Sequence, residues 1–330
     1  MTLLTICIPT YNFGDYIGTM LDSFLGQITD DIEVLVFDGA STDNTSETVL
    51  SRKNYFINLK YHKQSYRGGI DRDIDTAVHL AKGKYCWILS ADDIVLPGSI
   101  NNILTILKTG YDLYICEHSN YRCSIEDARP YPIFKDLDSP YLYDMNSRDD
   151  INKYFQTALT TEVFLTFLST PIFRRDIWIK SSVNDEVFGK CWIVAARLLP
   201  ELFNGIKIYY MNNTLLSKRS VNKSYIYSNS VSQFRILMIN LPEIVNLSVP
   251  KKHICHLELR RILRVEVPMK FLLRTKLEAD NSEFVKNEFY GAISYIYSDG
   301  NVLEQFKKFV ILYIPFYFLK KITKAIKILK

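Results

Sequence analysis

The sequence lacks several features that would assign it to common protein classes. Among its 330 residues, no apolar run reaches the roughly 18 residues that a membrane-spanning helix needs. Its six cysteines form no CxxC pair, and no charged N-terminal region precedes an apolar stretch, so we expect neither a zinc or redox motif nor a secretory signal. The net charge of +4 is too small to indicate a nucleic-acid partner.

Internal repeats and low-complexity tracts are also missing, whereas apolar runs of strand length are frequent. Cys7 and Cys86 lie inside such runs and are expected to be small buried side chains. Unpaired cysteines of this kind are typical of a reducing compartment. The composition, 48% hydrophobic and 23% charged, is that of a globular protein with material for a core.

The most informative stretch is Lys84–Ile100, KYCWILSADDIVLPGSI. Its apolar part, Tyr85–Leu89, predicts a strand buried on both faces of a parallel sheet. Asp92 and Asp93 follow at the carboxyl end of this strand, where open α/β sheets bind ligands. Because adjacent carboxylates repel, we expect a divalent cation bridging to substrate phosphates to hold them at an open cleft. Alone, the pair could also be a helix cap beside a solvated acid.

Strand and helix patterns alternate with short links through the first part of the chain. This alternation predicts an α/β fold with a mainly parallel sheet and right-handed connections. The expected strands are Leu3–Pro9, Ile32–Phe37, Phe56–His62, Tyr85–Leu89, Asp112–Cys116, Phe164–Phe173 and Ile206–Met211. The expected helices are 16–25, 41–50, 69–81, 99–108, 174–180 and 192–203, and Ser124–Arg148 is expected to be a long loop.

After Asn222 the patterns become helical only, which predicts a catalytic domain over residues 1–222 and a helical C-terminal region over 223–330. The expected helices are Val231–Val245, His253–Val265, Phe284–Tyr297 and Leu303–Lys330.

The last segment, Phe306–Lys330, combines aromatic and apolar residues with seven lysines, at positions 307, 308, 320, 321, 324, 327 and 330. A basic amphipathic helix of this kind suits the surface of an anionic membrane. The alternative is a helix that packs on the catalytic domain or on a partner.

Four sequence blocks occur in an order and spacing that resemble glycosyltransferase family 2, whose nucleotide-sugar domain has the GT-A fold. They are ICIPTYN, VLVFDGASTDNT, GGIDRDIDTAVHLAKGKY and WILSADDIVLPGSI, and they cover roughly residues 1–110. The later stretches FLSTPIFRRDIW and TLLSKRSVNKS are similar to O-antigen sugar transferases of the abequosyltransferase type.

The resemblance implies an inverting, metal-dependent transferase that uses a nucleotide-sugar donor. It implies Mg²⁺ or Mn²⁺ on Asp93, with Asp92 on the ribose side. It places nucleotide contacts at Pro9, Thr10, Tyr11, Asp38, Arg72, Asp92 and Arg219.

Several of these residues have alternative interpretations. Asp38 could instead form an Asx turn or cap a helix. Arg72 could face the pyrophosphate or pair with Asp71, and Arg219 could clamp phosphate or be an ordinary loop arginine.

Two positions depart from the family pattern. Gly39 stands where many members carry a second aspartate that reads uracil in some of them, so the donor could be a CDP, GDP or dTDP sugar rather than a UDP sugar. Ser90 stands where the metal block usually begins with Asp or Asn.

The catalytic base is expected at Asp185 or Glu186, the carboxylates closest to the family's base region. Either of them could also be a solvated surface charge.

The sequence therefore predicts a cytoplasmic transferase, peripheral on the inner face of a bacterial plasma membrane. It would add one sugar, a deoxyhexose by the weaker resemblance, to a lipid-linked oligosaccharide. The alternative is a catalytically degenerate scaffold of a glycan assembly complex. A nucleotidyltransferase is disfavoured because PTYNFGDY is not a glycine-rich, basic phosphate loop.

Overall fold

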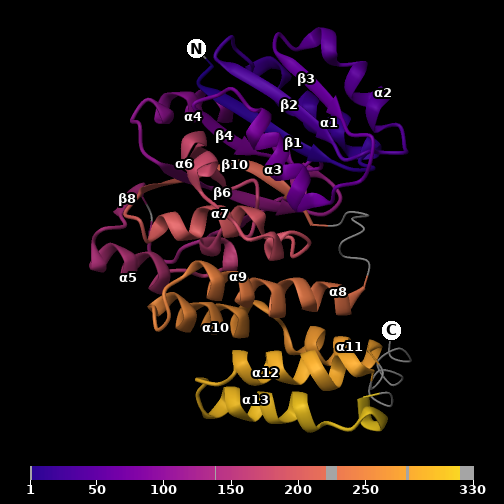
Figure 1. Cartoon of the computed structure of the whole chain (residues 1–330), viewed down its shortest axis with the longest axis vertical. Helices are drawn as coiled ribbons and strands as arrows, with labels where there is room; N and C mark the ends of the chain where they lie inside the picture. Colours follow the sequence, from indigo (N-terminus) through magenta and orange to yellow (C-terminus); the bar gives the residue numbers. More distant parts are fainter. Residues whose placement is uncertain (1, 138, 221–228, 280–281, 320–330) are drawn as a thin grey trace. The chain divides into compact units, whose positions relative to one another are not determined.

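The computed structural model describes residues 2–137, 139–220, 229–279 and 282–319 (Figure 1). The chain divides into two compact units, Met1–Asn222 and Lys223–Lys330.

The first unit is built on one ten-stranded mixed sheet, in the order β3-β2-β1-β4-β9-β6-β10-β5, with β7 paired to β6 and β8 to β10. Strands β1 to β4 are parallel, and β9 runs antiparallel between β4 and β6. The strands are β1 (Leu4–Thr10), β2 (Ile32–Asp38), β3 (Leu59–Lys63), β4 (Tyr85–Ile88), β5 (Ile94–Val95), β6 (Leu113–Tyr121), β7 (Arg129–Tyr131), β8 (Tyr141–Asp144), β9 (Pro171–Arg174) and β10 (Lys207–Arg219).

Helices cover both faces of this sheet, which explains why its central strands β1, β2 and β4 are buried along their whole length. In β1, Ile6 and Ile8 belong to the core shared with α1 and α4, whereas the Cys7 thiol faces the Ala77 carbonyl of α3. The helices of this unit are α1 (Gly14–Phe24), α2 (Thr45–Leu50), α3 (Ile70–Leu80), α4 (Ser99–Leu107), α5 (Arg148–Gln156), α6 (Arg175–Lys180) and α7 (Ile193–Leu202). Short 3₁₀ turns are η1 (Leu25–Gln27), η2 (Lys53–Tyr55), η3 (Ile125–Asp127), η4 (Thr161–Phe164) and η5 (Asp185–Val187).

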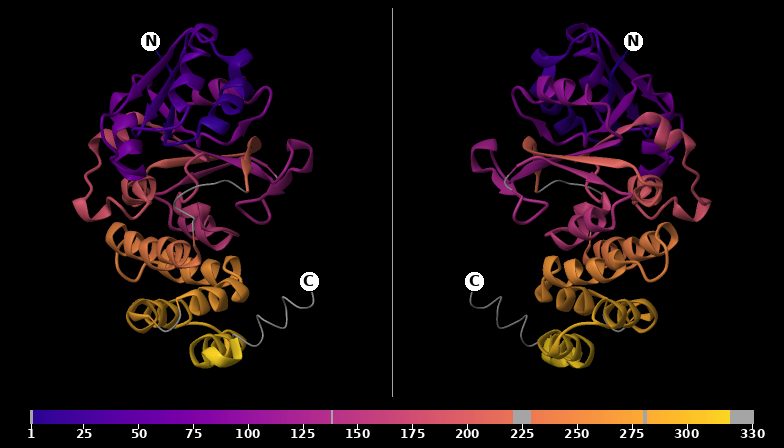
Figure 2. Two further views of the ribbon diagram at one scale, coloured as in Figure 1. Left: turned by 90° about the vertical axis from the view of Figure 1, so that its right-hand side faces the viewer. Right: turned by 90° about the vertical axis from the view of Figure 1, so that its left-hand side faces the viewer.

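The second unit contains helices packed in successive layers (Figure 2). They are α8 (Ser230–Phe234), α9 (Leu241–Ser248), α10 (Ile254–Glu266), α11 (Met269–Glu278), α12 (Tyr290–Ile296) and α13 (Val302–Tyr313), with π-helical segments η7 (Arg235–Asn240) and η8 (Val285–Phe289). In the part of the chain that the structure describes, no helix has the length and apolar character needed to cross a bilayer.

A buried lysine ties the end of α13 to α11. The Lys276 ammonium donates to the carbonyls of Ile311, Leu312 and Ile314 at 2.9, 2.7 and 3.1 Å. These are acceptors that the end of a helix leaves without intrahelical partners. Burial lowers the pKa of Lys276, so the three carbonyls have to compensate for its lost hydration.

Some sequence-based boundaries were wrong for identifiable reasons. The expected strand Phe164–Phe173 begins instead with η4, because the Thr160 hydroxyl accepts from the Glu162 amide, and Leu165 then has a φ of 60°. Only Pro171–Arg174 forms a strand. The expected loop after Ser124 contains β7 and β8, which pair with β6 and β10.

In the second unit, α11 was not expected, and the helix expected from Leu303 ends at Tyr313. Lysines 320, 321, 324, 327 and 330 lie outside the described residues.

Candidate active site

The predicted ligand edge of the sheet lies where β1, β2 and β4 end. Thr10 at the end of β1 is in register with Asp38 at the end of β2. On the other side of β1 lies β4, after which the chain reaches Asp92 and Asp93. The connections α1 and α3 lie on opposite faces of the sheet, so β1 and β4 flank a topological switch point, where such sheets leave a crevice.

Each acid of the pair after β4 accepts a hydrogen bond from a serine. The Ser90 hydroxyl donates to Asp92 Oδ1 at 2.5 Å, and the Ser169 hydroxyl donates to Asp93 Oδ2 at 2.8 Å. Ser169 also accepts from the Ser90 amide at 3.1 Å, so the two serines fix the carboxylates together. Ser90, which departs from the family pattern, thus supports the pair instead of supplying a third acid.

In this conformation the two acids do not face an open cleft as the sequence suggested, because their exposed fractions are only 3% and 1%. Three side chains from β6 and β10 lie close to them. The Tyr121 hydroxyl donates to the Asp92 carbonyl at 3.4 Å, and the Lys218 charge acts on Asp93. The Arg219 guanidinium lies 4.9 Å from the Tyr121 ring centre.

The acid pair has the chemistry of a divalent-cation site. Burial, and next the neighbouring Asp92, raise the pKa of Asp93 to about 8, so its charged form lacks sufficient compensation. Hard oxygen donors of this kind suit Mg²⁺ or Mn²⁺. No third His, Cys, Asp or Glu joins the pair within the described ranges, so substrate phosphates and water would have to complete the shell.

Asp38 is fully buried, and both of its carboxylate oxygens have partners. Oδ1 accepts from the Ser41 amide at 2.6 Å, and Oδ2 accepts from the Tyr61 hydroxyl at 2.5 Å. These contacts hold the loop after β2 in place, as expected if Asp38 forms a turn. Because each oxygen has a second lone pair, a contact with base or ribose stays a prediction.

Of the residues expected to contact the nucleotide at the end of β1, Thr10 has a side-chain oxygen without a hydrogen-bond partner in the described part of the chain. Pro9 is buried in β1, and Thr10 Oγ1 is buried without a hydrogen-bond partner among the described residues. Buried polar atoms rarely lack a partner, so Thr10 Oγ1 is a candidate ligand contact. The Tyr11 ring lies 4.3 Å from the Arg67 guanidinium, which brings a cation to the same edge.

Sequence reasoning missed Asp73, which occupies the space left by Gly39. A Cβ placed on Gly39 would lie 2.3 Å from Asp73 Oδ2, so the aspartate common in the family would require the Asp73 carboxylate to shift. Asp73 accepts from the Gln64 amide at 2.7 Å, and burial raises its pKa to about 6. The only signal in the sequence was its place four residues after Gly69, in the first turn of α3.

The two acids proposed as catalytic base lie in η5 and are exposed. The loop that follows them is fixed by Asp71, whose carboxylate accepts from the amides of Gly189, Cys191 and Ile193 at 2.8, 2.9 and 3.1 Å. Asp71 therefore binds this loop instead of Arg72.

Arg72 is also close to this loop, because its guanidinium lies 4.4 Å from the Phe188 ring centre. Asp71 and Arg72 both belong to the first turn of α3, which follows the carboxyl end of β3, so the η5 loop is attached at the predicted ligand edge of the sheet.

Arg219 lies between two rings, 5.0 Å from that of Tyr16 and 4.9 Å from that of Tyr121. Its Nε is buried and has no hydrogen-bond partner within the described part of the chain. The geometry therefore differs from that of a solvated loop arginine.

Comparisons with known proteins agree with this architecture. The model of the family described as "Glycosyl transferase family 2" matches residues 5–175. Abequosyltransferase RfbV of Salmonella typhimurium is 30% identical over 229 residues, which are 68% of this chain and 68% of the relative. The chain therefore belongs to glycosyltransferase family 2 and is a glycosyltransferase.

Solved structures confirm the GT-A fold. The crystal structure of Staphylococcus aureus TarS 1–349 in complex with UDP matches with a TM-score of 0.62 at 16% identity, covering 94% of this chain and 89% of that one. The mannosyltransferase PcManGT of Pyrobaculum calidifontis, in complex with GDP-Man and Mn²⁺, matches with a TM-score of 0.52 at 16% identity, covering 92% and 77%.

The raised pKa of Asp93 predicts how stability depends on pH without metal. The pKa of Asp93 is 3.8 in the unfolded chain and about 8 in the folded chain, so between these pH values the folded chain holds one extra proton. Its stability should therefore fall as the pH rises through this window. Urea unfolding with a chelator measures this slope. Between about pH 7 and 8, where Asp73 is mostly deprotonated, Asp93→Asn should flatten it, whereas the exposed control Asp30→Asn should not. Equal slopes for wild type and Asp93→Asn would contradict the assignment.

Proposed function

We propose that this glycosyltransferase moves one sugar, with inversion at the anomeric carbon, from a nucleoside-diphosphate donor to a lipid-linked oligosaccharide of a bacterial surface glycan such as O-antigen. The observation that carries the donor half is the buried acid pair at the carboxyl end of β4, the strand that pairs with β1. Its charge is left without full compensation, and a cation with a diphosphate would supply it.

Two buried groups support a phosphate site next to this pair. Arg219 Nε and Thr10 Oγ1 both lack a hydrogen-bond partner in the described ranges. The Lys218 charge already acts on Asp93. When donor and metal enter, Lys218 can turn from Asp93 to the phosphates, and the Arg219 guanidinium can add a second positive charge there.

The proposed reaction is a direct displacement. The acceptor hydroxyl oxygen forms a bond to the anomeric carbon while the bond from that carbon to the diphosphate oxygen breaks, and a carboxylate takes the hydroxyl proton. Asp185 and Glu186 are the candidates, because their exposed side chains precede the loop that Asp71 anchors. Cys191 in this loop is unsuitable, since burial raises the pKa of its thiol to about 12.

Bound Mg²⁺ or Mn²⁺, held by Asp93 and Asp92, would neutralise the charge that develops on the leaving diphosphate. The base of the donor is best sought among CDP, GDP and dTDP sugars, because Gly39 stands where an aspartate reads uracil in some family members. The relative named abequosyltransferase makes a deoxyhexose the first sugar to test.

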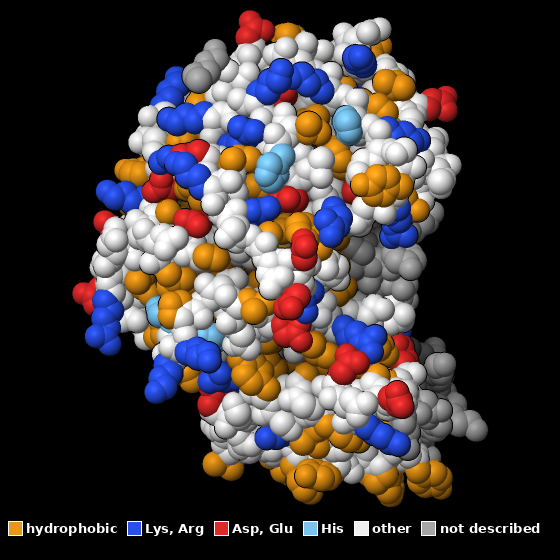
Figure 3. Space-filling model, viewed as in Figure 1, with side chains coloured by type: hydrophobic (Ala, Val, Ile, Leu, Met, Phe, Trp, Pro, Cys, Tyr) orange, Lys and Arg blue, Asp and Glu red, His pale blue; other side chains and the backbone are white. Residues whose placement is uncertain are grey.

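The second unit supplies the proposed membrane contact. Helix α13 and the turn after it expose an apolar stripe, along the lower edge of the second unit in Figure 3. It consists of Val302, Leu303, Phe306, Phe309, Tyr313, Tyr317 and Phe318, each more than half exposed. Ile311 points inward, and Lys307 and Lys308 lie beside the stripe. This arrangement suits the anionic inner face of the plasma membrane, where a lipid-linked acceptor would lie.

A catalytically degenerate scaffold is the alternative function. Its support is the burial of the acid pair and the absence of a fixed base. Such a protein would bind a nucleotide sugar without releasing the nucleoside diphosphate.

The first prediction concerns turnover. With a panel of UDP, CDP, GDP and dTDP sugars and Mg²⁺ or Mn²⁺, the wild type should release nucleoside diphosphate in the presence of acceptor. Asp93→Ala should lower this rate by about a hundredfold or more, because the leaving group loses its counter-charge. The exposed control Asp30→Ala should retain wild-type rates.

Wild-type turnover in Asp93→Ala would exclude the metal role. Donor binding by the wild type without any release of nucleoside diphosphate would favour the scaffold.

The second prediction concerns the base. Of Asp185→Asn and Glu186→Gln, one should lower kcat by about a hundredfold while donor affinity stays unchanged, because only proton transfer is lost. Glu201→Gln, in α7, serves as the control acid from the same part of the chain. Full activity in both variants, and in the double variant, would remove η5 from the mechanism.

The third prediction concerns the membrane. Phe306→Ser/Phe309→Ser should reduce sedimentation with vesicles of phosphatidylglycerol and phosphatidylcholine by about tenfold, because two inserted rings are lost. Tyr55→Ser/Ile57→Ser, which removes equally exposed apolar groups from the first unit, should bind as the wild type does. Unchanged sedimentation of the α13 variant would refute the membrane contact.

A further inference from the structure

The second unit contains a pocket that takes no part in the proposed transfer reaction. It has a volume of about 460 Å³ and is formed by α9, the turn that follows it, α10 and α12. Its lining residues are Asn246, Lys251, Lys252, His253, His256, Leu257, Arg260 and Tyr295.

The lining is basic and includes no carboxylate. Arg260 is neutralised by Asp299, to which its Nε and Nη2 donate at 2.9 and 2.6 Å. Lys251 and Lys252 are exposed and make no ion pair among the described residues. Two positive charges therefore stand at the pocket without a counter-charge, which makes the site attractive to an anion.

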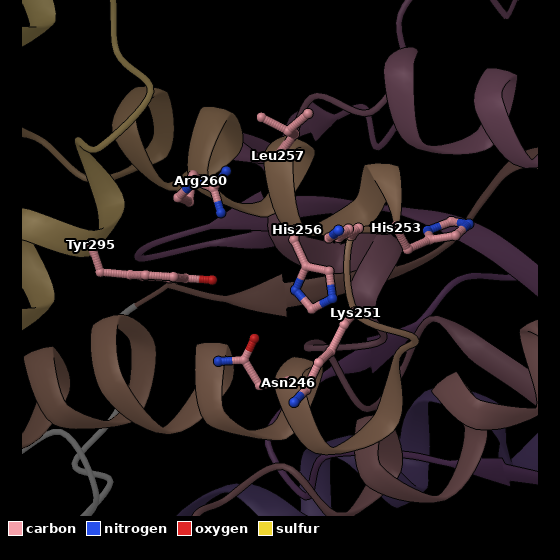
Figure 4. Close-up of a pocket in the computed structure, with 8 residues that line it drawn as sticks. Asn246, Lys251, His253, His256, Leu257, Arg260 and Tyr295 are labelled. Atoms are coloured by element: carbon pink, nitrogen blue, oxygen red, sulfur yellow. The ribbon is translucent and has the colours of Figure 1, made fainter.

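Polar groups from three helices point toward a common space in this pocket. Figure 4 shows the Tyr295 hydroxyl, the Asn246 amide, the His256 ring and the Arg260 guanidinium directed toward it. In the Arg260–Asp299 pair the Nη1 amino group takes no part. The hydroxyl, the amide and Nη1 can donate hydrogen bonds to the oxygens of a bound anion.

Helix α10 begins at this pocket and adds to the attraction. His253, at the N-cap, accepts from the Cys255 amide at 3.3 Å and so satisfies one of the first-turn amides. The His256 amide donates to the His253 carbonyl at 3.1 Å, so it is mainly the helix dipole that favours negative charge in front of this helix end. The basic lining and the helix end thus act in the same direction.

We propose that this pocket binds a phosphate group. The ligand is a phosphate monoester or diester, carried either by a soluble molecule or by the head group of an anionic lipid. Leu257 and the Tyr295 ring add apolar wall, and the volume exceeds that of one phosphate, so the site suits a phosphate bearing an organic group. This assignment does not depend on the transfer reaction.

Binding can be tested on the full chain with a chelator present, so that no metal loads the acid pair. Titration calorimetry with inorganic phosphate and glycerol 3-phosphate tests soluble ligands, and sedimentation with phosphatidylcholine vesicles containing phosphatidic acid tests lipids. Lys251→Gln/Lys252→Gln should weaken binding by about tenfold or more, because two charge-assisted contacts are lost. Tyr295→Phe, which removes one hydroxyl, should weaken it less. Circular dichroism and urea unfolding check that both variants fold.

The control is Lys270→Gln/Lys286→Gln, which removes the same charge from exposed positions of the second unit outside the pocket. Weaker binding of glycerol 3-phosphate in the pocket variant but not in the control assigns a soluble ligand. The same difference with vesicles alone assigns a lipid head group. The proposal is overturned if the wild type binds neither probe, or if pocket and control variants bind alike.

Discussion

The repulsion between Asp92 and Asp93 is the constraint on which the catalytic unit depends. Both acids are buried at the end of β4, where Ser90 and Ser169 fix their orientation and the Lys218 charge offsets part of their charge. The supporting groups come from the loop after β4, the segment before β9 and the end of β10. The mixed half of the sheet therefore serves to bring neutralising groups to two acids that the parallel half positions.

The parallel half of the fold could be predicted because its signals are local. Apolar runs such as Tyr85–Leu89 and the helix patterns between them need only neighbouring residues to be recognised. The strand predicted over Phe164–Phe173 was wrong because a threonine cap and the left-handed conformation of Leu165 override the apolar composition of this region. Likewise, β7 and β8 gain their partners only through β6 and β10, which lie far away in the sequence.

The residues of the candidate site likewise divide into those that local patterns predict and those that depend on contacts elsewhere in the fold. Asp92, Asp93 and Thr10 follow strands that the pattern predicts, so their proximity could be anticipated from the order of the elements. The positions of Asp73 and Ser169 could not be anticipated. Asp73 lies against Gly39 and accepts from Gln64, and Ser169 donates to Asp93, which is far away in the sequence. Burial of the acid pair was also unforeseen, because contacts such as that of the Tyr121 hydroxyl with Asp92 join elements that are far apart in the sequence.

The close approach of Asp73 to Gly39 has a consequence for how related enzymes can differ. Within this backbone, positions 39 and 73 compete for the volume of a single carboxylate. A side chain added at position 39 would require the Asp73 carboxylate to turn or shift, because the two would meet in the same space. A substitution at position 39 would therefore disturb Asp73 and, through it, the hydrogen bond to Gln64.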